Sequence, residues 1–388
     1  MIPERQPHLD ALRQAAQAQP LGLYLHIPFC VDRCTYCSFA TTRDRSQQAQ
    51  TIQRLIQEVA QWGAELERPA VDTLYLGGGT PSLLTSAELE QLTSAIKQSF
   101  DLSPLREATL EANPGTIDLD WLRQARALGW DRISLGVQAL DDALLARLGR
   151  IHDSAAALEG LALAAQAGFQ RRSADLMVGI PGQSLPKVLA DARTLVSTGI
   201  EHMSIYLLDL DKACPLRAEI DAGRLALPSE DEVANAFEAL QEELPRLGLA
   251  PYEISNYARP GAESIHNSRY WERQPYLGLG PSAASQMGPF RWTESSVLPA
   301  WSEGRGQAEW QELGPAEMLG EIPLLGLRLH RGIDWSMLRC QAKALNLQPL
   351  CDAWEARLRG LAKEGLVTWE GDQVHLSSRG MLMSNGIL

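Results

Sequence analysis

Three cysteines stand close together near the start of the chain, in the sequence Cys30-Val-Asp-Arg-Cys34-Thr-Tyr-Cys37. Thiolates select zinc, Cu(I) or iron–sulfur clusters. A structural zinc site uses four ligands, and no second pair of Cys or His follows at a matching distance. A cubane cluster held by three cysteines keeps one iron open for a small molecule. The spacing therefore favours an iron–sulfur cluster over an incomplete zinc knuckle.

The CxxxCxxC spacing, with the aromatic Tyr36 before the last cysteine, resembles the signature of radical S-adenosylmethionine (SAM) enzymes. The resemblance implies that Cys30, Cys34 and Cys37 bind a [4Fe–4S] cluster, and that the amino and carboxylate groups of SAM chelate the fourth iron. Reductive cleavage of SAM would then give a 5′-deoxyadenosyl radical. In such proteins the cofactor carries the radical, while the polypeptide positions it and excludes water and oxygen.

The remaining composition is typical of a globular protein in a reducing compartment. With 388 residues, 45% hydrophobic and 21% charged, the chain is long enough for a barrel and a second unit. The other cysteines, Cys214, Cys340 and Cys351, form no disulfide framework, and the first 20 residues hold no signal-peptide core. We expect a cytoplasmic protein without a transmembrane span. The net charge of −13 argues against a nucleic-acid partner and leaves peripheral membrane contact open.

Strand-like segments alternate with segments of helical period in the first half of the chain. The expected strands are Leu21–Pro28, Val71–Leu76, Ala108–Glu111, Arg132–Val137, Ser173–Val178 and His202–Leu207. The expected helices are Gln47–Glu67, Ser86–Ser99, Asp118–Leu128, Asp141–Leu148, Ala155–Ala167 and Pro186–Val196. Six successive βα units predict an α/β fold with a parallel, right-handed wound sheet. Periodicity leaves open a flat doubly wound sheet, whereas the radical SAM resemblance implies a partial (β/α)6 barrel.

Glycines and polar residues follow the expected strands where each one ends, which is where catalytic groups lie in βα barrels. The first strand leads into the cysteine loop, and the second into Gly77-Gly-Gly-Thr80-Pro81. By resemblance to the porphyrin-related branch of the family, the residues expected to bind SAM are Tyr24, Gly78, Gly79, Thr80, Glu111, Gln138, Arg150 and Asp175. The alternatives are a tight turn for the glycines and an ion pair or cap for Arg150 and Asp175.

The chain is similar to the oxygen-independent coproporphyrinogen III oxidase family. The similarity lies in His26-Ile-Pro-Phe-Cys30, the GGGTP element, Gly136-Val-Gln138 and Asp175-Leu-Met-Val-Gly-Ile-Pro. True oxidases of this family carry a further cysteine two positions after the third, and an N-terminal arm that helps to cover the porphyrinogen. Here Phe39 takes that position, and the cluster loop begins at residue 30. Both departures count against oxidative decarboxylation.

A second branch of the family, the HemW-type haem chaperones, is marked by an HNxxYW sequence. It stands here as His266-Asn267-Ser-Arg-Tyr270-Trp271. Neutral imidazole is a common ligand of haem iron, and Tyr and Trp supply flat apolar walls. The resemblance implies that His266, Asn267, Tyr270 and Trp271 bind haem. A packed or capped histidine is the alternative, and Cys214 of a Cys-Pro dipeptide is either a second candidate ligand or a loop cysteine.

Three segments are expected along the chain: an N-terminal extension over residues 1–20, the radical SAM partial barrel over 21–228, and a mostly helical C-terminal domain over 229–388. The HNxxYW element occupies 266–271 in the last segment. Two short alternating runs within 366–376 predict a β-hairpin. Helices followed by such a hairpin resemble a winged-helix-like end over 315–388, where an acidic chain makes DNA binding unexpected.

The sequence thus predicts a HemW-like haem chaperone that binds a [4Fe–4S] cluster, SAM and haem and passes haem to acceptor haemoproteins, respiratory ones among them. The competing hypotheses are oxidative decarboxylation of coproporphyrinogen III and another radical SAM modification of tetrapyrroles. Chaperone action is favoured over dehydrogenase activity, and no residue is assigned a catalytic role. A homodimer and contact with a membrane face stay open.

Overall fold

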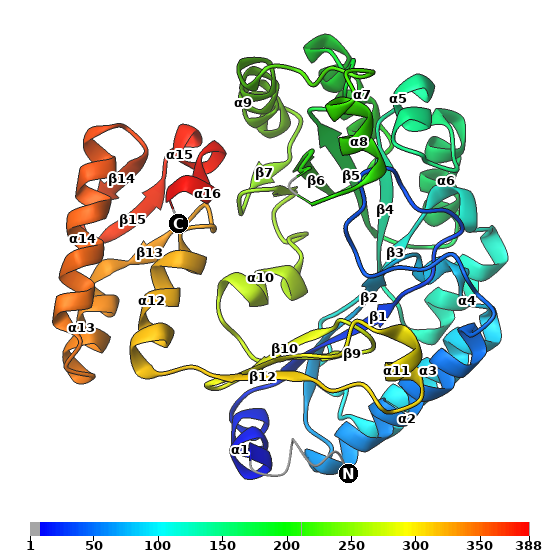
Figure 1. The fold of residues 1–388 in the computed structure, drawn as a ribbon, viewed down its shortest axis with the longest axis horizontal. Helices are drawn as coiled ribbons and strands as arrows, with labels where there is room; N and C mark the ends of the chain where they lie inside the picture. Colours follow the sequence, from blue (N-terminus) through cyan, green and yellow to red (C-terminus); the bar gives the residue numbers. More distant parts are fainter. Residues whose placement is uncertain (1–7, 211, 388) are drawn as a thin grey trace.

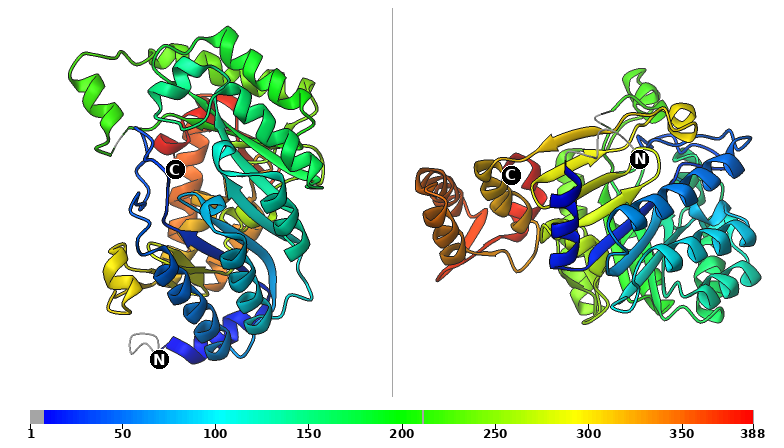
Figure 2. Two further views of the ribbon diagram at one scale, coloured as in Figure 1. Left: turned by 90° about the vertical axis from the view of Figure 1, so that its right-hand side faces the viewer. Right: turned by 90° about the horizontal axis from the view of Figure 1, so that it is seen from below.

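The main body of the molecule is a curved sheet covered on its outer side by helices (Figure 1, Figure 2). The computed structural model describes residues 8–210 and 212–387. Its parallel strands are β1 (Leu21–Ile27), β2 (Val71–Gly78), β3 (Glu107–Ala112), β4 (Arg132–Gln138), β5 (Arg171–Val178) and β6 (His202–Leu207). Each pairs in parallel with the next strand along the chain. This confirms the predicted barrel of six βα units.

The helices between these strands follow the predicted segments closely. They are α2 (Gln48–Glu65), α3 (Ser86–Ser99), α4 (Leu119–Leu128), α5 (Asp142–Arg147), α6 (Ser154–Gln166) and α7 (Leu185–Ser197). Thr85 and Glu88 form a capping box at the start of α3, and Gly129 ends α4 in the left-handed conformation with φ 106°. Short 3-10 turns, η2 (Pro81–Leu83) and η3 (Pro114–Thr116), follow β2 and β3.

The same sheet continues beyond both edges of the parallel strands. Next to β1 lies the parallel strand β9 (Tyr276–Leu279), followed by antiparallel β10 (Ala284–Met287), β11 (Phe290–Thr293) and β12 (Glu309–Glu312). Next to β6 lie β8 (Asn256–Ala258) and β7 (Ala250–Pro251). The sequence did not predict these strands, because segments of two to four residues carry no readable alternation.

Four helices accompany this second half of the sheet: α8 (Pro215–Asp221), α9 (Glu230–Arg246), α10 (Ile265–Trp271) and α11 (Leu298–Ser302). The first helix of the chain, α1 (Leu9–Ala18), buries Leu12 in the main core. Of the predicted N-terminal extension, residues 1–7 lie outside the described residues. No helix in the described part of the chain is long and apolar enough to cross a membrane.

A small unit at the C-terminal end stands apart from the barrel, at the left of Figure 1. It contains α12 (Pro315–Gly326), α13 (Trp335–Ala344), α14 (Gln348–Lys363), α15 (Ser378–Leu382), α16 (Ser384–Ile387) and the strands β13 (Ile333–Asp334), β14 (Val367–Glu370) and β15 (Gln373–Leu376). The antiparallel pair β14 and β15 confirms the predicted hairpin. Its apolar cluster is separate from the main core. The winged-helix resemblance and the division of the chain at residue 228 stay predictions.

Candidate functional site

A cavity of about 360 Å³ opens at the carboxyl ends of the parallel strands. All three cysteines of the CxxxCxxC sequence line it. The predicted SAM residues in its lining are Gly78, Gly79, Thr80, Glu111, Gln138, Arg150 and Asp175. Tyr24 is not among the lining residues, and its hydroxyl lies 3.0 Å from His26 Nδ1. The barrel thus gathers at one mouth all but one of the residues that the sequence singled out for the cluster and SAM.

The cysteine loop is fixed by backbone hydrogen bonds to neighbouring elements. The Cys30 amide donates to the Thr42 carbonyl at 3.0 Å, and the Thr35 amide donates to the Leu148 carbonyl at 3.0 Å. Burial raises the pKa of the Cys30 and Cys37 thiols. A metal must therefore overcome this cost, because it binds the deprotonated thiolate. Backbone groups therefore position much of the loop.

The polar environment of the cysteines fits a bound cluster. The Arg150 guanidinium donates to Cys34 Sγ at 3.2 Å and to the Gly136 carbonyl at 2.6 Å. No set of three or more His, Cys, Asp or Glu side chains in residues 8–210 and 212–387 is arranged around a single metal ion.

Two carboxylates face the cavity from β3 and β5. Glu111 accepts hydrogen bonds from the Tyr75 hydroxyl at 2.7 Å and from the Gly78 amide at 3.1 Å. Asp175 accepts from the Ser134 hydroxyl at 3.2 Å. Burial raises the pKa of Glu111 to about 7 and that of Asp175 to about 6. Such perturbed acids in a cleft mark a candidate binding site.

Among the buried polar atoms without a partner in the described protein, Gln138 Oε1 and Arg150 Nε belong to residues that line the cavity. Gln138 also adopts a left-handed conformation, with φ 70°, at the end of β4. Strained backbone and unsatisfied polar atoms are costly, and they cluster where a ligand completes the site. Together with the carboxylates, this amide and guanidinium could recognise hydroxyl, amino and carboxylate groups of a ligand such as SAM.

The triple glycine packs closely against its own protein. A Cβ on Gly78 would lie 2.6 Å from the His26 ring, and one on Gly79 would lie 2.6 Å from the Phe29 carbonyl oxygen. Gly78 has φ 110°, which side chains rarely adopt. The missing side chains let the end of β2 approach β1 and the cysteine loop, a role that the sequence analysis did not foresee. Contact of these glycines with SAM stays a prediction.

The HNxxYW element forms α10, at the opposite end of the barrel from the cavity. His266 is completely buried, with Nδ1 at 3.0 Å from the Thr73 hydroxyl and Nε2 at 2.9 Å from the Tyr270 hydroxyl. Burial lowers the pKa of His266 to about 3, so the imidazole is neutral. Neither ring nitrogen is free in this conformation. Haem ligation by His266 stays a prediction, and it would require α10 to leave the barrel.

The other candidate haem residues lie around the same helix or on α8. Asn267 and Trp271 are half-buried, and the Arg328 guanidinium lies over the Trp271 ring at 5.3 Å. Cys214 is half-buried at the N-cap of α8, outside the cavity lining. These positions neither gather around one cavity nor face the cysteine loop together. The structure therefore brings together the predicted cluster and SAM residues but does not bring the predicted haem residues to the same mouth.

SAM affinity is expected to depend on pH through Glu111. If Glu111 accepts a hydrogen bond from a ribose hydroxyl, as the sequence predicts, binding favours the deprotonated form of this carboxyl group, whose pKa burial raises to about 7. Affinity should therefore rise as the pH increases to about 7 and level off above it. Calorimetry on the reconstituted protein from mildly acidic to mildly alkaline pH measures this. In Glu111→Gln the dependence should flatten and binding should weaken by roughly 1.5–3 kcal/mol; a native affinity independent of pH would contradict the assignment.

Comparison with known protein sequences relates this chain to radical SAM proteins and to haem chaperones. The model of the radical SAM superfamily matches residues 24–195, which include the cysteine loop. The protein "Heme chaperone HemW" of Mycobacterium tuberculosis (strain ATCC 25618 / H37Rv) is 33% identical over 379 residues, which cover 95% of this chain and 94% of that protein. The protein of the same name from Lactococcus lactis subsp. lactis (strain IL1403) is 30% identical, over 95% of this chain and 96% of its own length.

The fold is also similar to a solved structure. Coproporphyrinogen III oxidase (HemN) from Escherichia coli, described as a radical SAM enzyme, superposes with a TM-score of 0.82 over 97% of this chain and 92% of that one. The sequence identity in this superposition is 22%. The likeness extends to the strands beyond residue 228 and to the small C-terminal unit, because nearly the whole chain is covered. It concerns the fold alone.

Proposed function

Because this chain belongs to the HemW family of haem chaperones within the radical SAM superfamily, we propose that it binds haem, a [4Fe–4S] cluster and SAM, and that it delivers haem to acceptor haemoproteins. The observation that carries the proposal is the cavity in which three cysteines meet two carboxylates and two unpartnered polar atoms. When bound, the cluster and SAM supply one-electron chemistry. The polypeptide holds and shields them.

Each group of residues has a separate task in this proposal. Cys30, Cys34 and Cys37 bind the cluster, and Arg150 donates a hydrogen bond to Cys34 Sγ. The residues that bind SAM are Gly78, Gly79, Thr80, Glu111, Gln138, Arg150 and Asp175. Tyr24 supports this side of the cavity indirectly, because its ring centroid lies 6.0 Å from that of Tyr75. Thr80 also hydrogen-bonds the Cys30 thiol, which links the SAM side of the cavity to the cluster side.

The position of Phe39 supports a chaperone over an oxidase. It lies in the cavity lining, two residues after Cys37, where true coproporphyrinogen oxidases carry a further cysteine. Its side chain is 64% exposed. A phenyl ring offers neither a metal ligand nor a proton to a substrate, but it gives the mouth an apolar edge. The alternative activity, oxidative decarboxylation of coproporphyrinogen III, has the likeness of the fold in its favour.

Haem is the cargo in this proposal, and acceptor haemoproteins, respiratory ones among them, are the partners. Delivery takes place in the cytoplasm, with the barrel meeting a membrane face only peripherally and with a homodimer as a candidate assembly. The axial ligand is either His266 of a displaced α10 or another residue such as Cys214. A cytoplasmic protein of net charge −13 has no attraction for nucleic acid.

Transfer of haem tests this function. The anaerobically reconstituted protein is loaded with haem and mixed with increasing amounts of an apo-haemoprotein, and the Soret band of the acceptor is followed. Direct delivery predicts saturable loading and a transfer rate that rises with the acceptor concentration. Passive release predicts a rate that does not depend on the acceptor. Absence of saturable haem binding, or a rate independent of the acceptor, would refute the chaperone proposal.

A further inference from the structure

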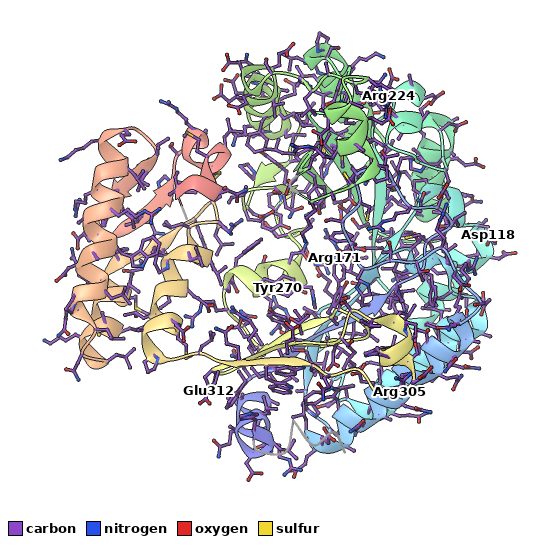
Figure 3. All side chains as sticks on the ribbon, viewed as in Figure 1. Asp118, Arg171, Arg224, Tyr270, Arg305 and Glu312 are labelled. Atoms are coloured by element: carbon purple, nitrogen blue, oxygen red, sulfur yellow. The ribbon has the colours of Figure 1, made fainter. Side chains whose placement is uncertain are left out.

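Helix α10 closes the barrel at the end opposite the cavity and lies near the centre of the molecule (Figure 1). The Glu107 carboxylate, at the start of β3, accepts from the His266 backbone amide at 3.0 Å. Arg269 is 1% exposed and forms an ion pair with Asp72 on β2. Charged side chains therefore fix both ends of this short helix to the starts of two barrel strands. Tyr270 of α10 and Arg171, which pairs with Glu107 at 3.7 Å, are labelled in Figure 3.

A line of side chains runs from α10 along β2 to the cavity. His266 contacts Thr73 through Nδ1 and lies with its ring centroid 5.1 Å from that of Tyr75. Thr73 and Tyr75 are alternate residues of β2, so their side chains stand on the same face of the sheet. The Tyr75 hydroxyl in turn donates to Glu111 at 2.7 Å. Two direct contacts thus link the buried imidazole to the carboxylate: one joins His266 to Tyr75, and the other joins Tyr75 to Glu111.

The imidazole is held in a single orientation. Thr73 and Tyr270 occupy both of its nitrogens, and a hydroxyl can donate to or accept from a neutral ring. Tyr75 lies between this ring and that of Tyr24, whose centroid is 6.0 Å away. Packing on both sides therefore sets the direction of the Tyr75 hydroxyl. The Tyr75 hydroxyl and the Gly78 amide are the two donors that hold the Glu111 carboxylate, one on each oxygen.

We propose that His266 is a positioning residue for the nucleoside end of the cavity. Through Tyr75 it holds the Glu111 carboxylate in the orientation that accepts hydrogen bonds from the ribose hydroxyls of SAM. The inference rests on the SAM binding proposed above. In this proposal the HNxxYW element affects SAM binding from inside the barrel, although it does not contact SAM.

The titratable groups that face Glu111 are Tyr24, Tyr75, Asp175, Tyr206 and Tyr270. Of these, the Tyr75 hydroxyl is the one that donates to Glu111, and its hydrogen bond favours the ionised carboxylate. Loss of this bond, or loss of its correct direction, raises the pKa of Glu111. The pH midpoint of SAM binding then moves upward, which a loss of stability alone would not cause.

The test measures SAM affinity and its pH midpoint by calorimetry on the reconstituted holoprotein. Tyr75→Phe removes the hydroxyl and should weaken binding about tenfold, as expected for a hydrogen bond to a charged group. His266→Phe keeps a ring against Tyr75 but loses both hydrogen bonds, and should weaken binding several-fold. Both should shift the midpoint upward. Because both changes act through one contact, the double variant should bind SAM no more weakly than Tyr75→Phe alone.

His202 provides a matched control. It is also buried, with its nitrogens at 2.7 Å from the Ser173 hydroxyl and 2.8 Å from the Tyr252 hydroxyl, but it contacts neither Tyr75 nor Glu111. His202→Phe should therefore lower stability as much as His266→Phe while leaving the pH midpoint in place. If His266→Phe does not fold, Tyr270→Phe, which removes the bond to Nε2, takes its place. His266→Gln, whose amide can both donate and accept, should restore most of the affinity.

The outcomes are distinct. An unchanged affinity and midpoint in folded His266→Phe or Tyr270→Phe, or an equal shift in His202→Phe, would overturn the positioning role and leave SAM binding intact. If the losses of SAM affinity in Tyr75→Phe and His266→Phe add up in the double variant, the positioning role would also be overturned, because the two residues would then act on SAM independently. Failure of the native protein to bind SAM would instead overturn the proposed function, and it is recognised before any variant is measured.

Discussion

Replacing any one of Cys30, Cys34 and Cys37 with alanine should abolish the iron–sulfur chromophore of the reconstituted protein. Each thiolate binds its own iron, and no other cysteine of the described residues lines the cavity to take its place. Iron and sulfide bound per molecule should fall nearly to zero. Metal analysis and the visible absorption spectrum after anaerobic reconstitution measure this loss.

The fold of these variants should survive, because the loop is held by backbone hydrogen bonds such as that from the Cys30 amide to the Thr42 carbonyl. Far-ultraviolet circular dichroism checks this point. Cys340→Ala is the matched control, since Cys340 is exposed on α13 in the small C-terminal unit. It should bind a full complement of iron. Full iron content in Cys30→Ala, Cys34→Ala or Cys37→Ala would refute the cluster assignment.

Much of the barrel and its mouth was predictable, because the signals are local. The strand that ends at residue 27 runs directly into the cysteine loop, and β2 runs into the glycines. Once six βα units are recognised, a residue at the carboxyl end of a strand is expected to lie at the mouth of the barrel. Glu111, Gln138 and Asp175 were assigned to SAM by the family resemblance, and the structure places all three in the lining of the cavity.

The sequence analysis missed residues whose roles depend on contacts with parts of the chain that are distant in sequence. Tyr75 lies in the middle of β2 and has the pattern of an ordinary strand residue, yet its hydroxyl donates a hydrogen bond to Glu111. Its only local signal is that it stands two positions before the first glycine, on the face that points into the barrel. The place of α10 could not be predicted either, because the contact between His266 and Thr73 joins residues 193 positions apart.

The HNxxYW element shows how a correct family assignment can leave a residue's task open. Its sequence points to haem, whereas the structure has His266 buried between two hydroxyls at the closed end of the barrel. Burial of an imidazole is costly unless both nitrogens find partners, and here both do. The geometry of the closed barrel is therefore explained without haem, and a form in which His266 binds haem must differ in the position of α10.

The reconstituted protein should not decarboxylate coproporphyrinogen III, even with SAM and a reductant present. Phe39 stands where the family resemblance places a further cysteine in the oxidases. The substrate would therefore meet a phenyl ring at this position and no extra thiol. Phe39→Cys is an informative companion variant, because it introduces the thiol at this position. It should also remain inactive.

The most direct test of the account is the amount of protoporphyrinogen IX formed per molecule of protein. Anaerobically reconstituted protein is incubated with coproporphyrinogen III, SAM and reductant, and a parallel sample is incubated with haem alone to verify that the same preparation binds its cargo. If the protein is a haem chaperone, haem binding should be saturable, and protoporphyrinogen IX should not exceed the level in a sample without protein. Multiple turnovers to protoporphyrinogen IX by the native protein would contradict the account and identify the chain as an oxidase.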